Sequence, residues 1–235
     1  MTLRITHVNL ARGFRGGERQ TELLIQALAA QGMTQQLVCR ADSPLRTRLQ
    51  GTPQLSFVTA NHQLMGHWRA AQSDLVHAHE AKAVHWAWLH HCLRGTPYIL
   101  TRRVPQEVKA TGFNRRCYRQ ASMAVAISSP IEQHLQARHW CPVQRIPSAL
   151  AHLKHDPANV ATLRSHYAGA FVIGHAGALV DKHKGQRELI AAARRLQTEM
   201  PDARFLMLGD GADGEALRAE SQDLPNVEWL GFKSN

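Results

Sequence analysis

The chain has few of the features that mark membrane, secreted or zinc-binding proteins. No run of apolar residues reaches the roughly 18 that a helix needs to cross a bilayer, and the first expected strand carries Arg4 and His7 rather than a signal-peptide core. The four cysteines form no Cys-x-x-Cys pair and lack a histidine partner pattern. These absences argue against a zinc site and a disulfide framework, and we expect a cytoplasmic protein.

Acidic and aromatic residues are also scarce. The chain has 18 acidic and 28 basic residues, which gives a net charge of +10 and favours an anionic partner. Aromatic residues make up only 6% of the chain. A nucleic-acid partner is disfavoured, because no helix-turn-helix, zinc-finger or RNA-binding aromatic signature is present. The basic residues cluster at Arg102, Arg103, Lys109, Arg115, Arg116 and Arg119. An anionic membrane surface, a phosphorylated acceptor and a solvated basic face all remain open for this cluster.

Short strand patterns alternate with helical patterns along the chain, which is typical of an α/β protein with a parallel sheet. The expected strands of the first part are 3–10, 36–39, 55–58, 75–78, 98–101, 123–126 and 143–146. A second series begins with strands at 171–176, 204–208 and 227–230. We therefore expect a first domain at 1–150, a connection at 151–168 and a partial second domain at 169–235. Three strands are few for a doubly wound sheet, so we expect the polypeptide to be incomplete at its C-terminus.

The most informative segment is 172–186, in which a buried strand leads through a basic, glycine-bearing loop into a helix. A helix that opens at Gly185 would direct free N–H groups and the positive end of its dipole toward the loop, where Lys182 and Lys184 add charge. This pattern predicts a site for a phosphate-bearing ligand. A solvated loop whose lysines only aid solubility is the alternative from this segment alone.

A similar unit opens the chain. The strand at 3–10 is followed by a glycine-rich loop at 11–17 and a helix at 18–31. Gly16 and Gly17 allow a ligand to approach the backbone and can adopt positive φ. The glycines do not have the G-x-G-x-x-G spacing, and no acidic residue ends the next strand, so a Rossmann oxidoreductase is disfavoured.

Six short motifs resemble those of the retaining family-4 glycosyltransferases. They are Gly-Gly-Glu at 16–18, Asp-Leu-Val-His-Ala-His at 74–79, Ala-Ile-Ser at 126–128, the stretch 172–185 ending in Lys-Gly, Leu-Gly-Asp-Gly at 208–211 and Asn-Val-Glu-Trp-Leu-Gly at 226–231. Their order and spacing carry the resemblance. It implies a GT-B-like α/β fold with a complete N-terminal Rossmann-like doubly wound parallel sheet and the first part of a second Rossmann-like domain.

The resemblance implies that a hexose moves from a nucleotide-diphosphate sugar, with a UDP-sugar favoured, to a hydroxyl acceptor with retention of configuration. No cofactor or metal is expected, and no Asp-x-Asp pair follows a strand. The expected acceptor is a glycan or glycolipid of the envelope, such as a lipopolysaccharide precursor. The enzyme would then work in the cytoplasm, with peripheral contact at the inner face of the membrane as an option.

By the same resemblance, the catalytic residues are Lys184, His79 and Arg103. Donor and phosphate binding is assigned to Gly16, Gly17, Lys182, Gly185, Gly209, Asp210 and Gly211. Glu18 and Arg102 are placed on the acceptor side. A histidine that ends a strand is more often a structural hydrogen-bond partner, and Glu18 also suits the first turn of a helix by charge alone, so both alternatives stay open.

Three departures from the family pattern stand out. Ala178 occupies the place of the usual arginine after Gly177, and Arg102 and Arg103 replace the histidine that often follows the fifth strand. The Glu-x7-Glu segment that holds the donor sugar is expected beyond Asn235, which leaves the activity of this form open. A non-catalytic nucleotide- or phosphate-binding module is the alternative function.

Overall fold

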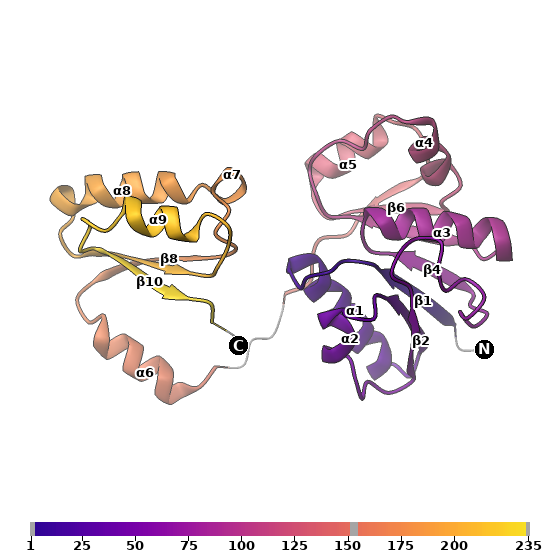
Figure 1. Ribbon diagram of the computed structural model, residues 1–235, viewed down its shortest axis with the longest axis horizontal. Coiled ribbons are helices and arrows are strands. Elements are labelled where there is room, and N and C mark those ends of the chain that lie inside the picture. The colour runs from indigo at the N-terminus through magenta and orange to yellow at the C-terminus, as the bar shows by residue number, and fades with distance from the viewer. Residues whose placement is uncertain (1–2, 151–154, 234–235) are drawn as a thin grey trace. The chain divides into compact units, whose positions relative to one another are not determined.

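A computed structural model describes residues 3–150 and 155–233 of the chain (Figure 1). It divides into two compact units, residues 1–151 and residues 152–235. Both are built from parallel strands joined by helices, which confirms the α/β class and the Rossmann-like character expected of each half. The first four residues of the expected connection at 151–168 lie outside the described residues, and the rest includes a helix, α6 (Pro157–His166).

The first unit holds a seven-stranded parallel sheet in the order β3-β2-β1-β4-β5-β6-β7. Its strands are β1 (Arg4–Asn9), β2 (Thr34–Cys39), β3 (Leu55–Thr59), β4 (Leu75–Ala78), β5 (Tyr98–Arg102), β6 (Met123–Ala126) and β7 (Val143–Arg145). The strand order reverses between β1 and β4, because β2 and β3 lie to one side of β1 and the later strands to the other. In doubly wound folds, ligands bind outside the carboxyl ends of the strands at such a switch point.

Helices cover both faces of this sheet. They are α1 (Gly16–Ala30), α2 (Pro44–Arg48), α3 (Ala81–Arg94), α4 (Gly112–Arg119) and α5 (Ser129–Gln136). Alternate residues of a strand point to opposite faces, so Leu37 of β2 packs with Ile25 of α1, whereas Val38 joins the core beneath α3, α4 and α5. The two apolar clusters are the physical basis of the three-layer arrangement.

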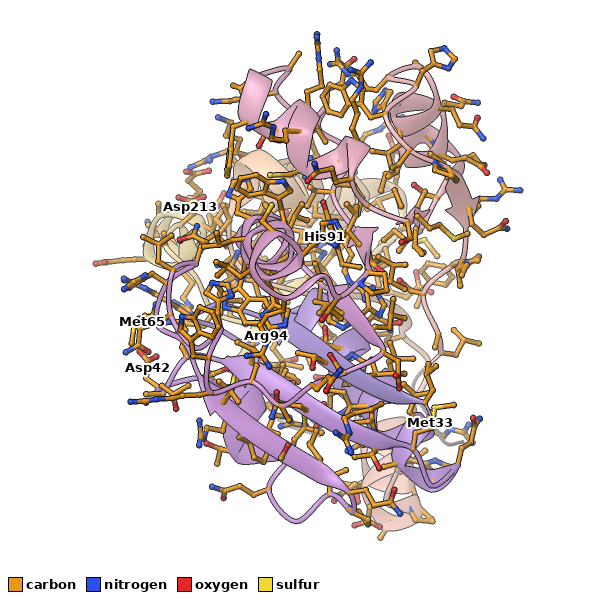
Figure 2. The ribbon with its side chains drawn as sticks, turned by 90° about the vertical axis from the view of Figure 1, so that its right-hand side faces the viewer. Met33, Asp42, Met65, His91, Arg94 and Asp213 are labelled. Atoms are coloured by element: carbon orange, nitrogen blue, oxygen red, sulfur yellow. The ribbon has the colours of Figure 1, made fainter. Side chains whose placement is uncertain are left out.

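Helix α3 is anchored to this core by buried aromatic side chains. Trp86 is fully buried, and its indole N–H donates to the carbonyl of Met65 at 2.7 Å. Figure 2 labels Met65 together with His91 and Arg94 of the last turn of α3. Glu80 caps the first turn of α3 by accepting from the N–H groups of Lys82 and Ala83 at 2.6 and 2.7 Å.

The second unit holds a three-stranded parallel sheet in the order β10-β9-β8. Its elements after α6 are β8 (Phe171–Ala176), α7 (Asp181–Lys184), α8 (Gln186–Glu199), β9 (Ala203–Leu208), α9 (Gly214–Glu220) and β10 (Val227–Gly231). Its core groups Leu179, Ile190, Ala193, Ala203, Phe205, Leu217 and Leu224. Hydrophobic side chains of α8 and α9 therefore cover the sheet.

Every strand end lies within two residues of its predicted position, but several short helices were not expected. α2, α4, α6 and α7 have four to ten residues each, too short for a clear apolar period. α1 also begins at Gly16, so Gly16 and Gly17 belong to its first turn rather than to the loop before it. Neither glycine has a positive φ, which corrects the conformational role expected for them. Among the described residues, no helix has both the length and the apolar character that a membrane span requires.

Candidate functional site

Three histidines meet at the carboxyl end of the first sheet, beside its switch point. His7 of β1 lies in register with His77 of β4, and His79 follows β4 by one residue. The ring centroids of His77 and His79 are 4.0 Å apart, and those of His7 and His79 are 5.2 Å apart. Parallel pairing of strands that are 70 residues apart in sequence thus creates a cluster of imidazoles.

Hydrogen bonds hold the cluster in place. His7 Nδ1 lies 3.0 Å from His79 Nε2, and His7 Nε2 lies 3.0 Å from the side-chain oxygen of Gln35 in β2. His77 Nε2 lies 2.7 Å from the hydroxyl of Thr101 in β5. His7 and His79 are buried, and His79 Nδ1 is a buried atom with no hydrogen-bond partner among the described residues.

The environment keeps these imidazoles neutral. Burial lowers the pKa of His7 to about 4, and burial with the nearby charges of His7 and Arg103 lowers that of His77 to about 3. The pKa of His79 is also held well below its usual value, first by burial and then by neighbouring charges. At neutral pH the cluster therefore offers hydrogen-bond donors and acceptors rather than positive charge.

Arg103 brings a cation to the same edge. A Cβ on Gly17 would lie 3.5 Å from Arg103 Cδ, so the arginine packs against the glycine backbone in the first turn of α1. Burial lowers the pKa of Arg103, whereas the charge of Glu18 opposes this change. Arg103 Nε is buried and has no hydrogen-bond partner in the part of the chain that the structure describes. The structure thus brings together four of the predicted residues, namely Gly17, Glu18, His79 and Arg103.

Arg102 does not join them. Its side chain donates to the carbonyl of Gln106, and its charge acts on Tyr118, a residue of the core beneath α3, α4 and α5. The reason is that Arg102 ends β5 and Arg103 follows it, since consecutive residues of an extended chain point to opposite faces. The exposed arginines of α4 lie on this other side of the sheet.

Glu18 has a structural task. Its carboxylate accepts from the backbone N–H of Arg15 at 2.9 Å, which is one half of a capping box at the start of α1. The side chain is 8% exposed. Of the two roles left open by the sequence, the first-turn carboxylate is the one with an observed contact.

In the second unit, Lys184 also packs against a glycine. A Cβ on Gly177 would lie 3.8 Å from Lys184 Cε and 3.7 Å from His175 Nε2. Lys184 and Lys182 are both exposed, and both belong to α7, which follows the loop after β8. A flexible ammonium group therefore stands at the carboxyl end of this sheet as well.

The turn after β9 packs backbone to backbone against the loop after β8. A Cβ on Gly209 would lie 1.9 Å from the carbonyl oxygen of Gly177, and one on Gly211 would lie 2.4 Å from that of Leu179. The Leu179 N–H donates to the Asp210 carbonyl at 3.0 Å, and the Asp210 carboxylate accepts from the Gly211 N–H at 2.8 Å. These contacts explain why glycine is needed at both positions.

Gly185 joins α7 to α8 in the left-handed conformation, with φ of 66°. α8 begins at Gln186, and the N–H of Arg187 donates to the Asp181 carboxylate at 2.8 Å. Because Asp181 occupies this N–H, the first turn of α8 is not fully free for a ligand as the sequence suggested. Lys182 and Lys184, rather than the N-terminus of α8, are therefore the main cationic groups beside this loop.

The three histidines are also the residues best placed to hold a metal ion among those described. One ligand nitrogen from each of His7, His77 and His79 lies within 4.8 Å of the others. Both nitrogens of His7 already have hydrogen-bond partners, however, and the cation of Arg103 acts on the same cluster. A metal ion bound by His7 would have to break one of these two hydrogen bonds and oppose that charge.

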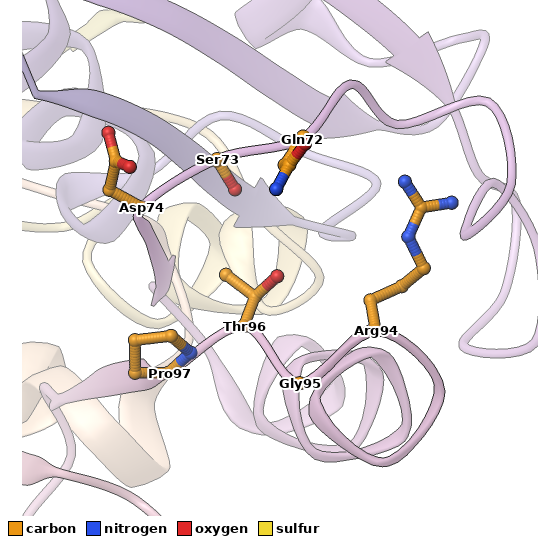
Figure 3. Close-up of a pocket in the computed structure, with 7 residues that line it drawn as sticks. All are labelled: Gln72, Ser73, Asp74, Arg94, Gly95, Thr96 and Pro97. Carbon is orange, nitrogen blue, oxygen red and sulfur yellow. The ribbon is translucent and has the colours of Figure 1, made fainter.

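A pocket of about 410 Å³ lies elsewhere in the first unit (Figure 3). It is lined by Gln72, Ser73, Asp74, Arg94, Gly95, Thr96 and Pro97. These residues directly precede β4 and β5, so the pocket lies at the amino ends of the strands. The histidines and Arg103 lie at the opposite ends, and the predicted site residues have no part in this pocket.

Sequence reasoning missed His7, Gln35 and Thr101 as members of the site. The alternation of His77 and His79 was visible, since residues two apart share a face of a strand. Placing His7 and Gln35 beside them required the order of β2, β1 and β4, which the doubly wound pattern implies only once the strands are assigned. No local motif marks these two residues.

Comparison with solved structures shows which folds the chain resembles, whereas a comparison with curated proteins finds no match. HepE of Anabaena in complex with UDP and glucose is 18% identical with a TM-score of 0.80, and the match covers 99% of this chain and 70% of that one. A glycosyltransferase of Rickettsia africae is 16% identical with a TM-score of 0.74, and the match covers 99% and 69%. The lipopolysaccharide outer core galactosyltransferase WaaB is 16% identical with a TM-score of 0.63 and the same coverage. These likenesses show a shared GT-B fold.

Family models match both units. The model described as Glycosyltransferase Family 4 matches residues 14–150, and the model described as Glycosyl transferases group 1 matches residues 170–235. The first match includes α1 with Gly17, the β4 histidines and Arg103, and the second includes Lys184 and the glycine turn after β9. The chain therefore belongs to the family-4 glycosyltransferases.

Proposed function

We propose that the chain transfers a hexose from a nucleotide-diphosphate sugar, preferably a UDP-sugar, to a hydroxyl acceptor with retention of configuration and without a metal ion. The observation that carries the proposal is the same arrangement in both units. In each, a cationic side chain packs against a glycine at the carboxyl end of a parallel sheet, Arg103 on Gly17 and Lys184 on Gly177. Such edges are the usual ligand sites of this fold.

Lys184 is the proposed catalytic cation. Negative charge develops on the leaving diphosphate as the sugar bond breaks, and a nearby ammonium group stabilises that charge more in the transition state than in the ground state. Lys182, Gly185 and the turn 209–211 complete the proposed donor side. The UDP bound to HepE and to further similar structures supports the choice of nucleotide.

The first unit is the proposed acceptor-side domain, with His79, Arg103 and the Gly16–Gly17 turn facing the reacting groups. The proposed acceptor is a glycan or glycolipid of the envelope, such as a lipopolysaccharide precursor, reached from the cytoplasm at the inner face of the membrane. The exposed arginines of α4 suit an anionic surface. The fold likeness to a lipopolysaccharide galactosyltransferase is consistent with such an acceptor. In this proposal residues 151–168 connect the two domains.

The test is release of nucleoside diphosphate from a panel of nucleotide sugars, with and without candidate acceptors. The anomeric configuration of the product, read by NMR, tests retention, and activity in excess EDTA tests independence of metal. Lys184→Ala should lower donor turnover about a hundredfold, as loss of one charge-stabilising contact does. Lys109→Ala removes an equally exposed lysine of the first unit and should leave donor hydrolysis unchanged. A loss below tenfold for Lys184→Ala, about 1.4 kcal/mol, contradicts the assigned role.

A further inference from the structure

Gln35 sets the direction of a chain of hydrogen bonds that ends at His79. The Gln35 side-chain nitrogen donates to the carbonyl of Ile25 in α1 at 3.0 Å, which leaves the side-chain oxygen to face His7. An amide oxygen only accepts, so His7 Nε2 at 3.0 Å must carry a hydrogen. The backbone of α1 thus determines the tautomer of a histidine in β1.

The same logic passes from His7 to His79. Burial keeps His7 neutral, so with a hydrogen on Nε2 its Nδ1 is bare and accepts. The group 3.0 Å away is His79 Nε2, which must donate. Because His79 is neutral too, its Nδ1 is bare, and this is the buried atom without a partner.

A second unpartnered group of opposite character lies nearby. Arg103 Nε carries a hydrogen, is buried and has no acceptor among the described residues, and the charge of Arg103 acts on His79. A buried donor and a buried acceptor without partners each destabilise the protein unless something meets them. A hydroxyl group donates and accepts at once, so a single hydroxyl placed between the two atoms would satisfy both.

We infer that Gln35 and His7 are positioning residues that hold His79 Nδ1 as a permanent acceptor for a sugar hydroxyl, with Arg103 Nε as the matching donor. This inference rests on the proposed function for the identity of the ligand. The hydroxyl belongs to the donor sugar or to the acceptor glycan, which present the same chemistry. Both atoms are covered in the ligand-free chain, so a sugar reaches them only after neighbouring side chains move.

The tautomer is tested by histidine ¹⁵N NMR on the whole chain. The signal of His79 Nδ1 should be that of a bare nitrogen. Gln35→Met removes the acceptor while nearly keeping the volume, and should give a mixture of both His79 tautomers. Thr101→Val is the matched control, because it removes the hydroxyl bonded to neighbouring His77 and should leave His79 unchanged. A hydrogen on His79 Nδ1 in the unaltered chain, or equal spectra for Gln35→Met and Thr101→Val, overturns the inference.

The ligand is tested by following the same signal with UDP-glucose, with UDP alone and with UDP plus methyl glucoside. A shift with UDP-glucose but not UDP assigns the hydroxyl to the donor sugar, and a shift only with methyl glucoside assigns it to the acceptor. A shift of the His79 Nδ1 signal with UDP alone, or no shift under any of the three conditions, contradicts binding of a sugar hydroxyl. Stoichiometric Zn²⁺ binding that abolishes the bond between His7 and His79 would identify a metal site instead.

Kinetics separate this inference from the proposed function. Gln35→Met should lower kcat/KM roughly tenfold, the effect of one misdirected hydrogen bond, whereas Thr101→Val should have a smaller effect. If no nucleotide sugar is turned over, the proposed function fails. The His79 tautomer of the ligand-free chain still decides whether the directed chain of hydrogen bonds from Gln35 to His79 exists.

Discussion

The two units share one arrangement of a cation and a glycine, but the surroundings of the cation differ between them. Each packs a cation against a glycine at the carboxyl end of a parallel sheet, but Arg103 stands among buried, neutral imidazoles, whereas Lys184 is exposed. The first unit holds its polar groups by side-chain hydrogen bonds, and the second holds its loops by close backbone contacts. The difference indicates that the first unit fixes the orientation of donors and acceptors, while the second supplies a mobile charge.

Mild acid should have the largest effect on this contrast, because the buried histidines whose pKa is lowered lie in the first unit. The unfolded chain binds protons on His7 and His77 near pH 6.5, but burial keeps both neutral in the folded chain down to about pH 4 and 3. Stability is therefore complete well above pH 6.5 and falls as the pH drops toward the folded values, by roughly 2 kcal/mol per histidine between pH 7.5 and 5.

Urea titrations followed residue by residue by NMR at pH 7.5 and pH 5 check this difference. Signals of β1 and β4 should lose protection at pH 5, and those of β8 and β9 should not. Equal losses in the two units would contradict the contrast in their histidine environments.

A methyl group at Gly209 should lower the stability of the second unit. Gly209→Ala places Cβ 1.9 Å from the Gly177 carbonyl oxygen at a φ of 133°, so the two loops must separate, at a cost of about 3 kcal/mol. Gly174→Ala in β8 is the control, since a Cβ there has no atom within 4 Å. The measurement is urea unfolding read from signals of β8 to β10. A stability within about 0.5 kcal/mol of the unaltered chain would mean that the backbone contact is not as close as described.

The smallest effect tests how Glu18 serves the first unit. Glu18→Ala removes the acceptor for the Arg15 N–H at the start of α1 and should destabilise that unit by about 1 kcal/mol. Glu18→Gln keeps an acceptor and should recover most of the loss. If the two variants are equally destabilised, the charge of Glu18 beside Arg103 matters more than its capping bond. The measurement is urea unfolding at pH 7.5, followed at α1.

Much of the fold was predictable because its signals are local. Parallel strands form short apolar runs, and the three strands of the second unit were located from such runs. The burial expected for β8 was wrong, because none of its residues is buried among those described. The short helices α2, α4, α6 and α7 were missed, since fewer than three turns give little apolar periodicity. Lys184, His79 and Gly17 were chosen by motif, whereas the divergence of Arg102 from Arg103 was not predicted.

The sequence by itself determined the class of the protein, the order of its strands and the glycine-bearing loops, because each depends on neighbours along the chain. Only the tertiary structure decided that β1 lies beside β4, so that Gln35, His7 and His79 form one directed chain of hydrogen bonds. It also decided that Gly209 is required by the Gly177 backbone. Both depend on contacts between distant segments, and hydrogen-bond direction and steric exclusion act through space.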